Sequence, residues 1–108
     1  MIAALALLAG LTVTDGDTVR LGAERIRLVG IDACELRGAQ RRSGCDVAQA
    51  RAATAALARA LRRGPVTIER RGHDRYGRTL AVVRAGGVSV GCRLVAEGLA
   101  VERYGACE

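Results

Sequence analysis

Carboxylates and arginines alternate in four short parts of this sequence, and their side chains could together hold a metal ion and a phosphate. They occupy residues 15–18, Arg27, residues 32–35 and residues 74–78. Clustering carboxylates costs free energy unless a cation or hydrogen bonds compensate them. Carboxylate oxygens suit a hard cation, and a guanidinium can donate two parallel hydrogen bonds to a phosphate. The residue types therefore predict a combined metal and phosphate site.

Each part alone has an ordinary structural explanation. Asp15-Gly16-Asp17 is typical of a hairpin corner. Asp32 with Glu35 could be a solvated loop, and residues 74–78 could be a charged hairpin. Chance rarely places all of them in one short chain. The single histidine, His73, could be read as a general base, but we expect it to be an exposed loop residue.

The spacing of apolar side chains predicts the elements that position these residues. Alternation of apolar and polar residues predicts strands over 11–14, 18–21 and 25–31, which would form a three-stranded meander. On the third strand, Ile26 and Leu28 share one face and Arg25 and Arg27 the other.

One long helix is predicted after a polar loop over residues 36–45. Asp46 can cap it, and Gln49 three residues later supports a capping box. Gly64-Pro65 ends the helix. The apolar stripe, which Thr54 shares, consists of Val47, Ala50, Leu57 and Leu61.

The last third of the chain predicts two strands, a short helix and a final extended piece. The expected elements are a strand at 66–70, a charged loop at 71–77, a strand at 78–84, a hairpin turn at Gly86-Gly87, a helix capped by Ser89 and ended by Gly98, and an extended piece at 99–104.

This order predicts an α+β fold that is mainly β: a five-stranded OB-fold barrel with one long and one short helix. The fold alone does not fix the chemistry. We expect one domain over residues 11–108. Residues 1–10 would be either a lead-in to the first strand or the remnant of a signal peptide. This stretch is too short to cross a bilayer, so no stable membrane association is expected.

Composition points to a polyanionic partner. All 17 basic residues are arginine, the net charge is +6 and the sequence contains no Phe or Trp. The core must therefore be aliphatic, and the basic balance favours nucleic acid.

The four cysteines are Cys34, Cys45, Cys92 and Cys107. Their long, irregular spacing argues against a four-thiolate zinc site. Two disulfides formed in an oxidising compartment are the favoured interpretation, with free buried thiols as the alternative. The favoured interpretation predicts a secreted or periplasmic protein.

The sequence resembles a known family, the thermonucleases or staphylococcal-nuclease-like domains. The matching stretches are residues 13–19, 26–35, 74–78 and 94–100. With the helix between them they cover residues 11–104, and their order and spacing agree with the family.

The resemblance implies a calcium-dependent phosphodiesterase on an OB barrel. Asp17, Asp32 and the main-chain carbonyl of Ala33 would hold Ca²⁺, with Asp15 close by. The family usually has Thr at position 33, but a backbone ligand tolerates Ala. It usually has Pro where this chain has Cys34.

The resemblance also assigns catalytic and substrate-binding residues. Glu35 would orient or deprotonate a water molecule as general base. Arg27 and Arg78 would bind the phosphate and stabilise charge in the transition state. Tyr76 and Tyr104 would contact phosphate or stack on a base, and a further backbone contact would come from Arg75.

These roles imply a monomeric nuclease that cleaves single-stranded DNA and RNA with little sequence preference, because its contacts are to the backbone. The alternatives are a catalytically weak OB-fold nucleic-acid-binding module and a structural disulfide-stapled domain. Acids in the phosphate site argue against a pure binding module.

The resemblance also suggests how the cysteines pair. Cys34 and Cys92 depart from the usual family pattern and are predicted to pair with each other, whereas Cys45 and Cys107 resemble positions that secreted relatives crosslink. We therefore predict Cys34–Cys92 and Cys45–Cys107, one of three possible pairings. The C-terminal helix that relatives often carry is expected to be absent, because the sequence stops at Glu108.

Overall fold

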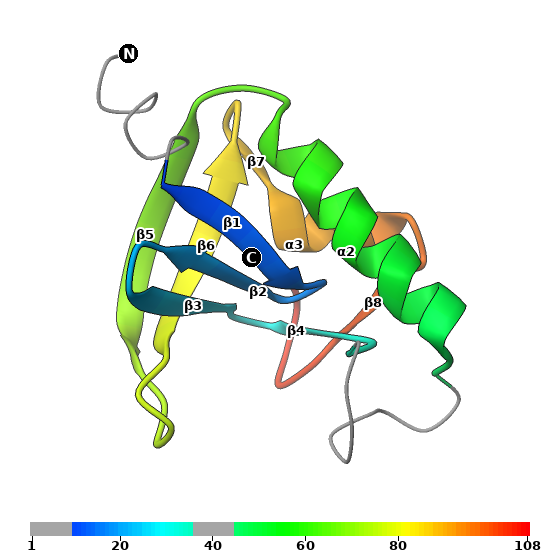
Figure 1. Cartoon of the computed structure of the whole chain (residues 1–108), viewed down its shortest axis with the longest axis horizontal. Helices are drawn as coiled ribbons and strands as arrows, with labels where there is room; N and C mark the ends of the chain where they lie inside the picture. Colours follow the sequence, from blue (N-terminus) through cyan, green and yellow to red (C-terminus); the bar gives the residue numbers. More distant parts are fainter. Residues whose placement is uncertain (1–9, 36–44) are drawn as a thin grey trace.

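Eight strands and two helices make up residues 10–35 and 45–108, the parts of the chain that the computed structural model describes (Figure 1). The elements are β1 (Leu11–Asp15), β2 (Thr18–Leu21), β3 (Glu24–Leu28), β4 (Ile31–Ala33), α2 (Val47–Leu61), β5 (Val66–His73), β6 (Thr79–Ala85), β7 (Val88–Ser89), α3 (Val90–Ala96) and β8 (Ala100–Glu102). The predicted lead-in (1–10) and loop (36–45) fall almost entirely outside the described residues.

Six strands form one mixed sheet in the order β1-β2-β3-β6-β5, with β7 pairing with β6. The pairs are antiparallel except β3 with β6, which run parallel with Ile26 opposite Thr79. β4 and β8 form a separate antiparallel pair, with Asp32 opposite Val101. The predicted meander, the mainly β class and the two helices are confirmed. The strands do not close into the predicted five-stranded barrel, because β4 leaves the larger sheet.

The departure of β4 explains why the strand expected over residues 25–31 is two strands. The N–H of Val29 still donates to Ala81 on β6, at 3.0 Å. Gly30 then adopts φ +79°, a left-handed conformation that other residues rarely tolerate. Its carbonyl accepts the N–H of Arg103 at 2.9 Å, next to β8. The chain therefore turns at Gly30 into the second sheet, although the alternating pattern runs through the break.

The hairpins of the second half follow local turn chemistry. Gly86 and Gly87 have φ +60° and +81°, as a two-residue turn with both central residues left-handed requires, so the predicted turn is confirmed. The charged loop predicted over 71–77 is too long, because β5 continues to His73 across an irregularity between Arg70 and Gly72. Exposed charged residues in an edge strand do not show the apolar alternation by which strands are found.

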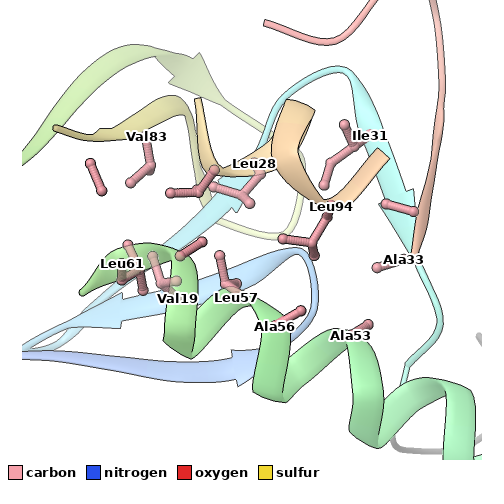
Figure 2. Close-up of a cluster of buried hydrophobic side chains, with 14 of the residues drawn as sticks. Val19, Leu28, Ile31, Ala33, Ala53, Ala56, Leu57, Leu61, Val83 and Leu94 are labelled. Atoms are coloured by element: carbon pink, nitrogen blue, oxygen red, sulfur yellow. The ribbon is translucent and has the colours of Figure 1, made fainter. Parts of the chain in front are cut away.

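Helix α2 covers the sheet with a face made largely of alanine. Its predicted capping box is present: Asp46 accepts the N–H of Gln49, whose side chain accepts the N–H of Asp46. Of the predicted apolar stripe, Ala50, Leu57 and Leu61 are buried as expected, whereas Val47 is 43% exposed. Figure 2 shows this face meeting the sheet and α3. The buried residues of α2 are Ala50, Ala53, Ala56, Leu57, Ala60 and Leu61.

Small side chains allow the β1–β2 turn to lie directly against α2. A Cβ atom added at Gly16 would be 2.6 Å from the Cβ of Ala53 and 2.9 Å from the Cβ of Ala33. Both distances are far shorter than van der Waals contact, so only glycine fits. The turn that carries Asp17 is thus fixed between the helix and β4.

Glu24 links three strands of the larger sheet. Its carboxylate accepts two hydrogen bonds from Arg70 on β5, at 2.9 and 2.7 Å, and one from the hydroxyl of Thr79 on β6, at 2.7 Å. The hydrogen bonds from Arg70, followed by that from Thr79, lower the pKa of Glu24 from 4.5 to about 2. The ionised carboxylate is therefore stabilised in the folded state.

Replacing Glu24 by Gln should lower the free energy of unfolding at neutral pH by about 1–2 kcal/mol, a value reduced for the solvent exposure of Arg70. Because the folded pKa is depressed, the contribution of Glu24 is present above pH 4.5 and is lost as the pH falls toward about 2. Urea unfolding across this range measures the difference. Glu97→Gln, an exposed control, should change stability by less than about 0.5 kcal/mol. A difference for Glu24→Gln that persists unchanged to pH 2 would contradict the assignment.

Candidate active site

Asp17 is the buried acid around which the candidate site is built. Only 1% of its surface is exposed. The hydroxyl of Thr18 donates to its Oδ1 at 2.9 Å, and the N–H of Ala33 donates to its Oδ2 at 3.1 Å. Nη1 of Arg27 lies 3.6 Å from the same Oδ2. A buried carboxylate requires such partners, and here they come from β2, β3 and β4.

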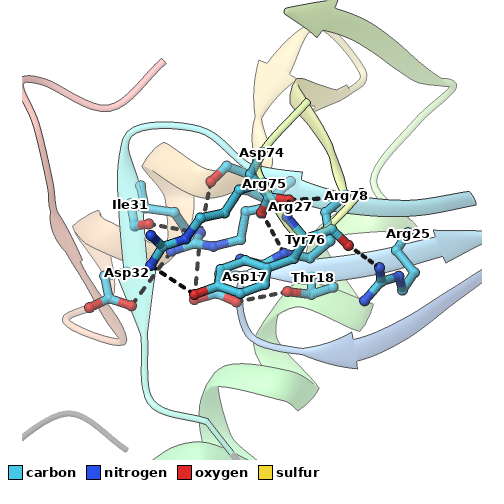
Figure 3. A network of polar contacts seen from close by, with 11 residues as sticks. Asp17, Thr18, Arg25, Arg27, Ile31, Asp32, Asp74, Arg75, Tyr76 and Arg78 are labelled. Carbon is cyan, nitrogen blue, oxygen red and sulfur yellow. Dashed lines mark hydrogen bonds and ion pairs between the residues drawn. The ribbon is translucent and has the colours of Figure 1, made fainter. Parts of the chain in front are cut away.

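Arg27 joins the two acids that the sequence predicts as metal ligands. Its Nη2 lies 3.7 Å from Oδ1 of Asp32, while Nη1 faces Asp17 (Figure 3). Nη1 also donates to the carbonyls of Leu28 and Ile31, at 2.9 and 3.0 Å, on either side of the break between β3 and β4. The guanidinium therefore holds the backbone turn and both carboxylates in one network.

Asp32 has a second guanidinium partner, which the sequence did not predict. Nη1 of Arg103 donates to Oδ2 of Asp32 at 3.0 Å. Arg103 follows β8, whose pairing with β4 brings the two residues together. The only signal in the sequence was its position beside Tyr104.

Glu35 lies beside the acid cluster and lines a small hollow of about 390 Å³ with Asp15 and Arg78. Burial raises the pKa of Glu35, and the negative charges of Asp17, Asp15 and Asp32 raise it further, against the opposing effect of Arg27. The position of Glu35 therefore favours either a proton on its carboxylate or an added cation nearby.

Arg78 is placed next to β3 by the parallel pairing of β3 with β6. Its Nε donates to Oδ2 of Asp74 at 2.7 Å. Asp74 also accepts the N–H groups of Tyr76 and Arg78, each at 2.9 Å. Burial raises the pKa of Asp74, but these hydrogen bonds outweigh burial and the net shift is downward. Asp74 thus fixes the turn and directs the Arg78 side chain.

A larger groove of about 840 Å³ joins these groups to both tyrosines. Tyr76 is 59% exposed, and the guanidinium carbons of Arg75 and Arg78 lie 5.1 and 5.7 Å from its ring centroid. Arg25, also absent from the predicted site, donates to the Tyr76 carbonyl (Figure 3). Tyr104 is almost fully exposed and has φ +60°, an unfavourable conformation for a non-glycine residue.

The fold therefore gathers the predicted site residues in three groups. Asp17, Arg27 and Asp32 interact directly, with the backbone of Ala33 bound to Asp17. Glu35, Arg78 and Asp15 line the smaller hollow, and the groove is lined by Arg75, Tyr76 and Tyr104. His73 is exposed as predicted, although it ends strand β5 and does not lie in a loop.

Both predicted cysteine pairings are wrong: the disulfides are Cys34–Cys45 and Cys92–Cys107. Cys34 directly follows β4 and Cys45 lies just before α2, so the first bond joins two adjacent elements, with Cα atoms 5.7 Å apart. The chain after β8 returns to α3, which places the Cα of Cys107 5.3 Å from that of Cys92. Cys34 and Cys92 were predicted to pair because both depart from the family pattern, but such a departure does not indicate that two residues lie close together in the fold.

The oxygen donors fit a calcium ion in type. The negative charges of Asp17, Asp15 and Asp32 all act on Glu35, and the guanidinium of Arg27 lies between Asp17 and Asp32, so carboxylate oxygens of the kind that calcium prefers already pair with a positive charge here. Within residues 10–35 and 45–108, no three His, Cys, Asp or Glu side chains are arranged as a metal-binding group. In this arrangement Asp32 faces Arg27 and Arg103.

Comparison with known proteins identifies a family and a relative of this chain. Residues 25–108 match the family described as "Staphylococcal nuclease homologue". The chain is also 37% identical over 100 residues to "Succinoglycan biosynthesis protein ExoI" of Rhizobium meliloti (strain 1021). That alignment covers 85% of this chain and 50% of the relative, so the chain spans about half the length of the relative.

Family membership indicates a nuclease-type or nucleic-acid-related function. The two disulfides are consistent with an extracellular or periplasmic location. Among the described helices, none is both long and apolar enough to cross a bilayer. The match over residues 25–108, together with the similarity to the Rhizobium protein, shows that the chain belongs to the staphylococcal nuclease homologue family.

Proposed function

We propose that this protein is a secreted or periplasmic, monomeric, calcium-dependent nuclease that hydrolyses phosphodiester bonds of single-stranded DNA and RNA. The observation that carries the proposal is the position of Glu35 and Arg78, which line both the smaller hollow and the larger groove. A carboxylate and a guanidinium thus face the same space, beside a pair of acids suited to a cation.

Asp17, Asp32 and the carbonyl of Ala33 would hold the calcium ion. When bound, Ca²⁺ supplies positive charge that neutralises a phosphate oxygen and lowers the pKa of nearby water. The burial of Asp17 and its hydrogen bonds from Thr18 and Ala33 fix one donor in place. Fixed donors need no reorganisation during the reaction.

Glu35 would act as the general base that orients and deprotonates the attacking water. A base works best when its pKa lies near the working pH, and the pKa of Glu35 is raised toward that range. Burial and neighbouring acids, which cost stability, would therefore make its carboxylate a better base.

Arg27 and Arg78 would bind the phosphate and stabilise the charge that develops in the transition state. Arg78 is held by Asp74 at one nitrogen, Nε, which leaves the outer nitrogens of its guanidinium available to a ligand in the groove. Arg27 would hold the phosphate close to Asp17 and Asp32.

The groove would bind the nucleic-acid chain through its backbone and through stacking. Tyr76 and Tyr104 present exposed rings, and Arg75 adds positive charge beside Tyr76. Stacking and phosphate contacts do not read base edges, so we expect low sequence preference, and stacking on exposed rings requires the unpaired bases of a single strand.

Glu35→Gln and Arg78→Ala should each reduce cleavage of denatured DNA in calcium by about 10²- to 10³-fold, because each removes an oriented group needed in the transition state. Initial rates measured with the oxidised protein test this. Arg84→Ala is the matched control: it removes an arginine whose Nη1 lies 3.0 Å from Glu69 on the exposed surface, and it should cut at the wild-type rate.

The same assay separates the proposal from its rival. Wild-type cleavage that continues unchanged in excess chelator would reject calcium dependence. Retention of DNA without any cleavage would favour the nucleic-acid-binding module. Unimpaired cutting by Glu35→Gln or Arg78→Ala would reject the site assignment.

Glu35→Gln should also raise Tm at neutral pH in the absence of calcium. Because burial and the neighbouring acids raise the folded pKa of Glu35, ionising it costs stability, and the neutral amide avoids this cost. The stability lost by ionising Glu35 is therefore absent below pH 4.5 and fully present above the raised pKa of the folded protein. Thermal scans at about pH 3 should therefore show no gain, and Glu97→Gln should show none at either pH. A loss of stability at neutral pH would contradict an acid-crowded site.

A further inference from the structure

The Asp32 carboxylate contacts two guanidinium groups, and one of them can move more easily than the other. Arg27 approaches Oδ1 at 3.7 Å and Arg103 donates to Oδ2 at 3.0 Å. Each oxygen of Asp32 thus already faces a positive charge. A divalent cation at Asp32 must compete with at least one of these groups.

Arg103 is the partner that can leave. Its side chain is 50% exposed, whereas that of Arg27 is 19% exposed. Moving Arg27 would also break its hydrogen bonds to the carbonyls of Leu28 and Ile31. Moving Arg103 exposes its guanidinium to water in the groove and breaks its contact with Asp32 and its contacts with the exposed Tyr104 side chain, a hydrogen bond and a cation–π contact 5.5 Å from the ring centroid.

The backbone keeps Arg103 beside Asp32 even when its side chain moves. Its N–H donates to the carbonyl of Gly30 at 2.9 Å, and β8 just before it pairs with β4. The Arg103 side chain can therefore change rotamer while its backbone stays in place, and it lines the same groove as Arg75 and Tyr76.

We propose that Arg103 is an internal counter-ion of Asp32 that competes with Ca²⁺ and is released into the groove when the ion binds. This inference rests on the proposed calcium site. Once released, the guanidinium can contact a phosphate of the nucleic-acid chain. Calcium binding and binding of the chain would then favour each other, because each draws on the same displacement of Arg103 from Asp32.

The proposal predicts that Arg103→Ala binds Ca²⁺ more tightly than the wild type. A half-exposed ion pair contributes little, so the expected gain is about two- to fivefold at low salt. This gain in affinity should shrink at high salt, because salt screens both the repulsion between Arg103 and Ca²⁺ and the attraction between Arg103 and Asp32. Arg103→Lys keeps the charge and should stay closer to the wild-type affinity.

Isothermal titration of Ca²⁺ into the oxidised full chain measures these affinities. Arg84→Ala is the control for loss of one positive charge, because its ion pair with Glu69 has the same 3.0 Å separation on the exposed surface. Thermal unfolding of each variant checks that the fold is intact. In the wild type, the Nε–H resonance of Arg103 should shift on addition of Ca²⁺, whereas that of Arg84 should not.

The outcomes distinguish this inference from the proposed function. Tight binding by Arg103→Ala with weaker or no binding by the wild type supports both proposals. Equal affinities overturn the role of Arg103 and leave the calcium site standing. Weaker binding by Arg103→Ala also overturns it, because Arg103 would then be holding Asp32 in place for the ion. No binding by either protein overturns the calcium site and this inference together.

Discussion

The burial of Asp17 is the constraint on which the rest of the structure depends. A carboxylate with 1% exposure is tolerated only with partners close at hand. Those partners are the hydroxyl of Thr18, the N–H of Ala33 and the guanidinium of Arg27. They fix β4 relative to the β1–β2 turn, and they require the break between β3 and β4 that lets Ala33 approach.

Small side chains make this arrangement sterically possible. Gly16 leaves no room for a Cβ atom between Ala53 of α2 and Ala33 of β4. A helix that buried larger residues at this point would push the turn outward and withdraw Asp17 from Ala33. The alanine-rich face of α2, on which Ala53 lies near Ala33 of β4 (Figure 2), therefore leaves room for the turn that carries Asp17.

Local signals in the sequence predicted the parts of the fold that local chemistry determines. The capping box at Asp46 and the Gly86-Gly87 turn depend on neighbouring residues and are confirmed. The break at Gly30 was missed, because it depends on pairing with β8, far along the chain. Disulfide partners and the contact of Arg103 with Asp32 are likewise set by tertiary distance.

The residues of the candidate site could be predicted from local sequence, whereas their partners are set by tertiary contacts. Asp17, Arg27 and Asp32 lie in short stretches whose residue types already imply their chemistry. Arg25 and Arg103 have no such setting, and in a chain whose basic residues are all arginine, neither stood out. The register of β3 with β6 places Arg25 at the smaller hollow, and the register of β4 with β8 places Arg103 at the groove.

Charge pairing in this protein serves both folding and the proposed chemistry. Asp17, Asp32 and Asp74 each face a guanidinium, which makes it possible to bring these acids together during folding. Glu35 is different: in the described parts of the chain it forms no salt bridge, and its carboxylate faces the field of three other acids.

Glu35 is also the residue that would have to take up and release a proton in the proposed reaction, and a firmly paired carboxylate would be a weak base. The paired acids are instead suited to exchange. A cation that replaces a guanidinium at Asp32 leaves that carboxylate neutralised and adds a free positive group to the groove, where a phosphate would need it. In this proposal the same arginine neutralises Asp32 in the absence of the ion and binds a phosphate of the substrate once the ion is bound.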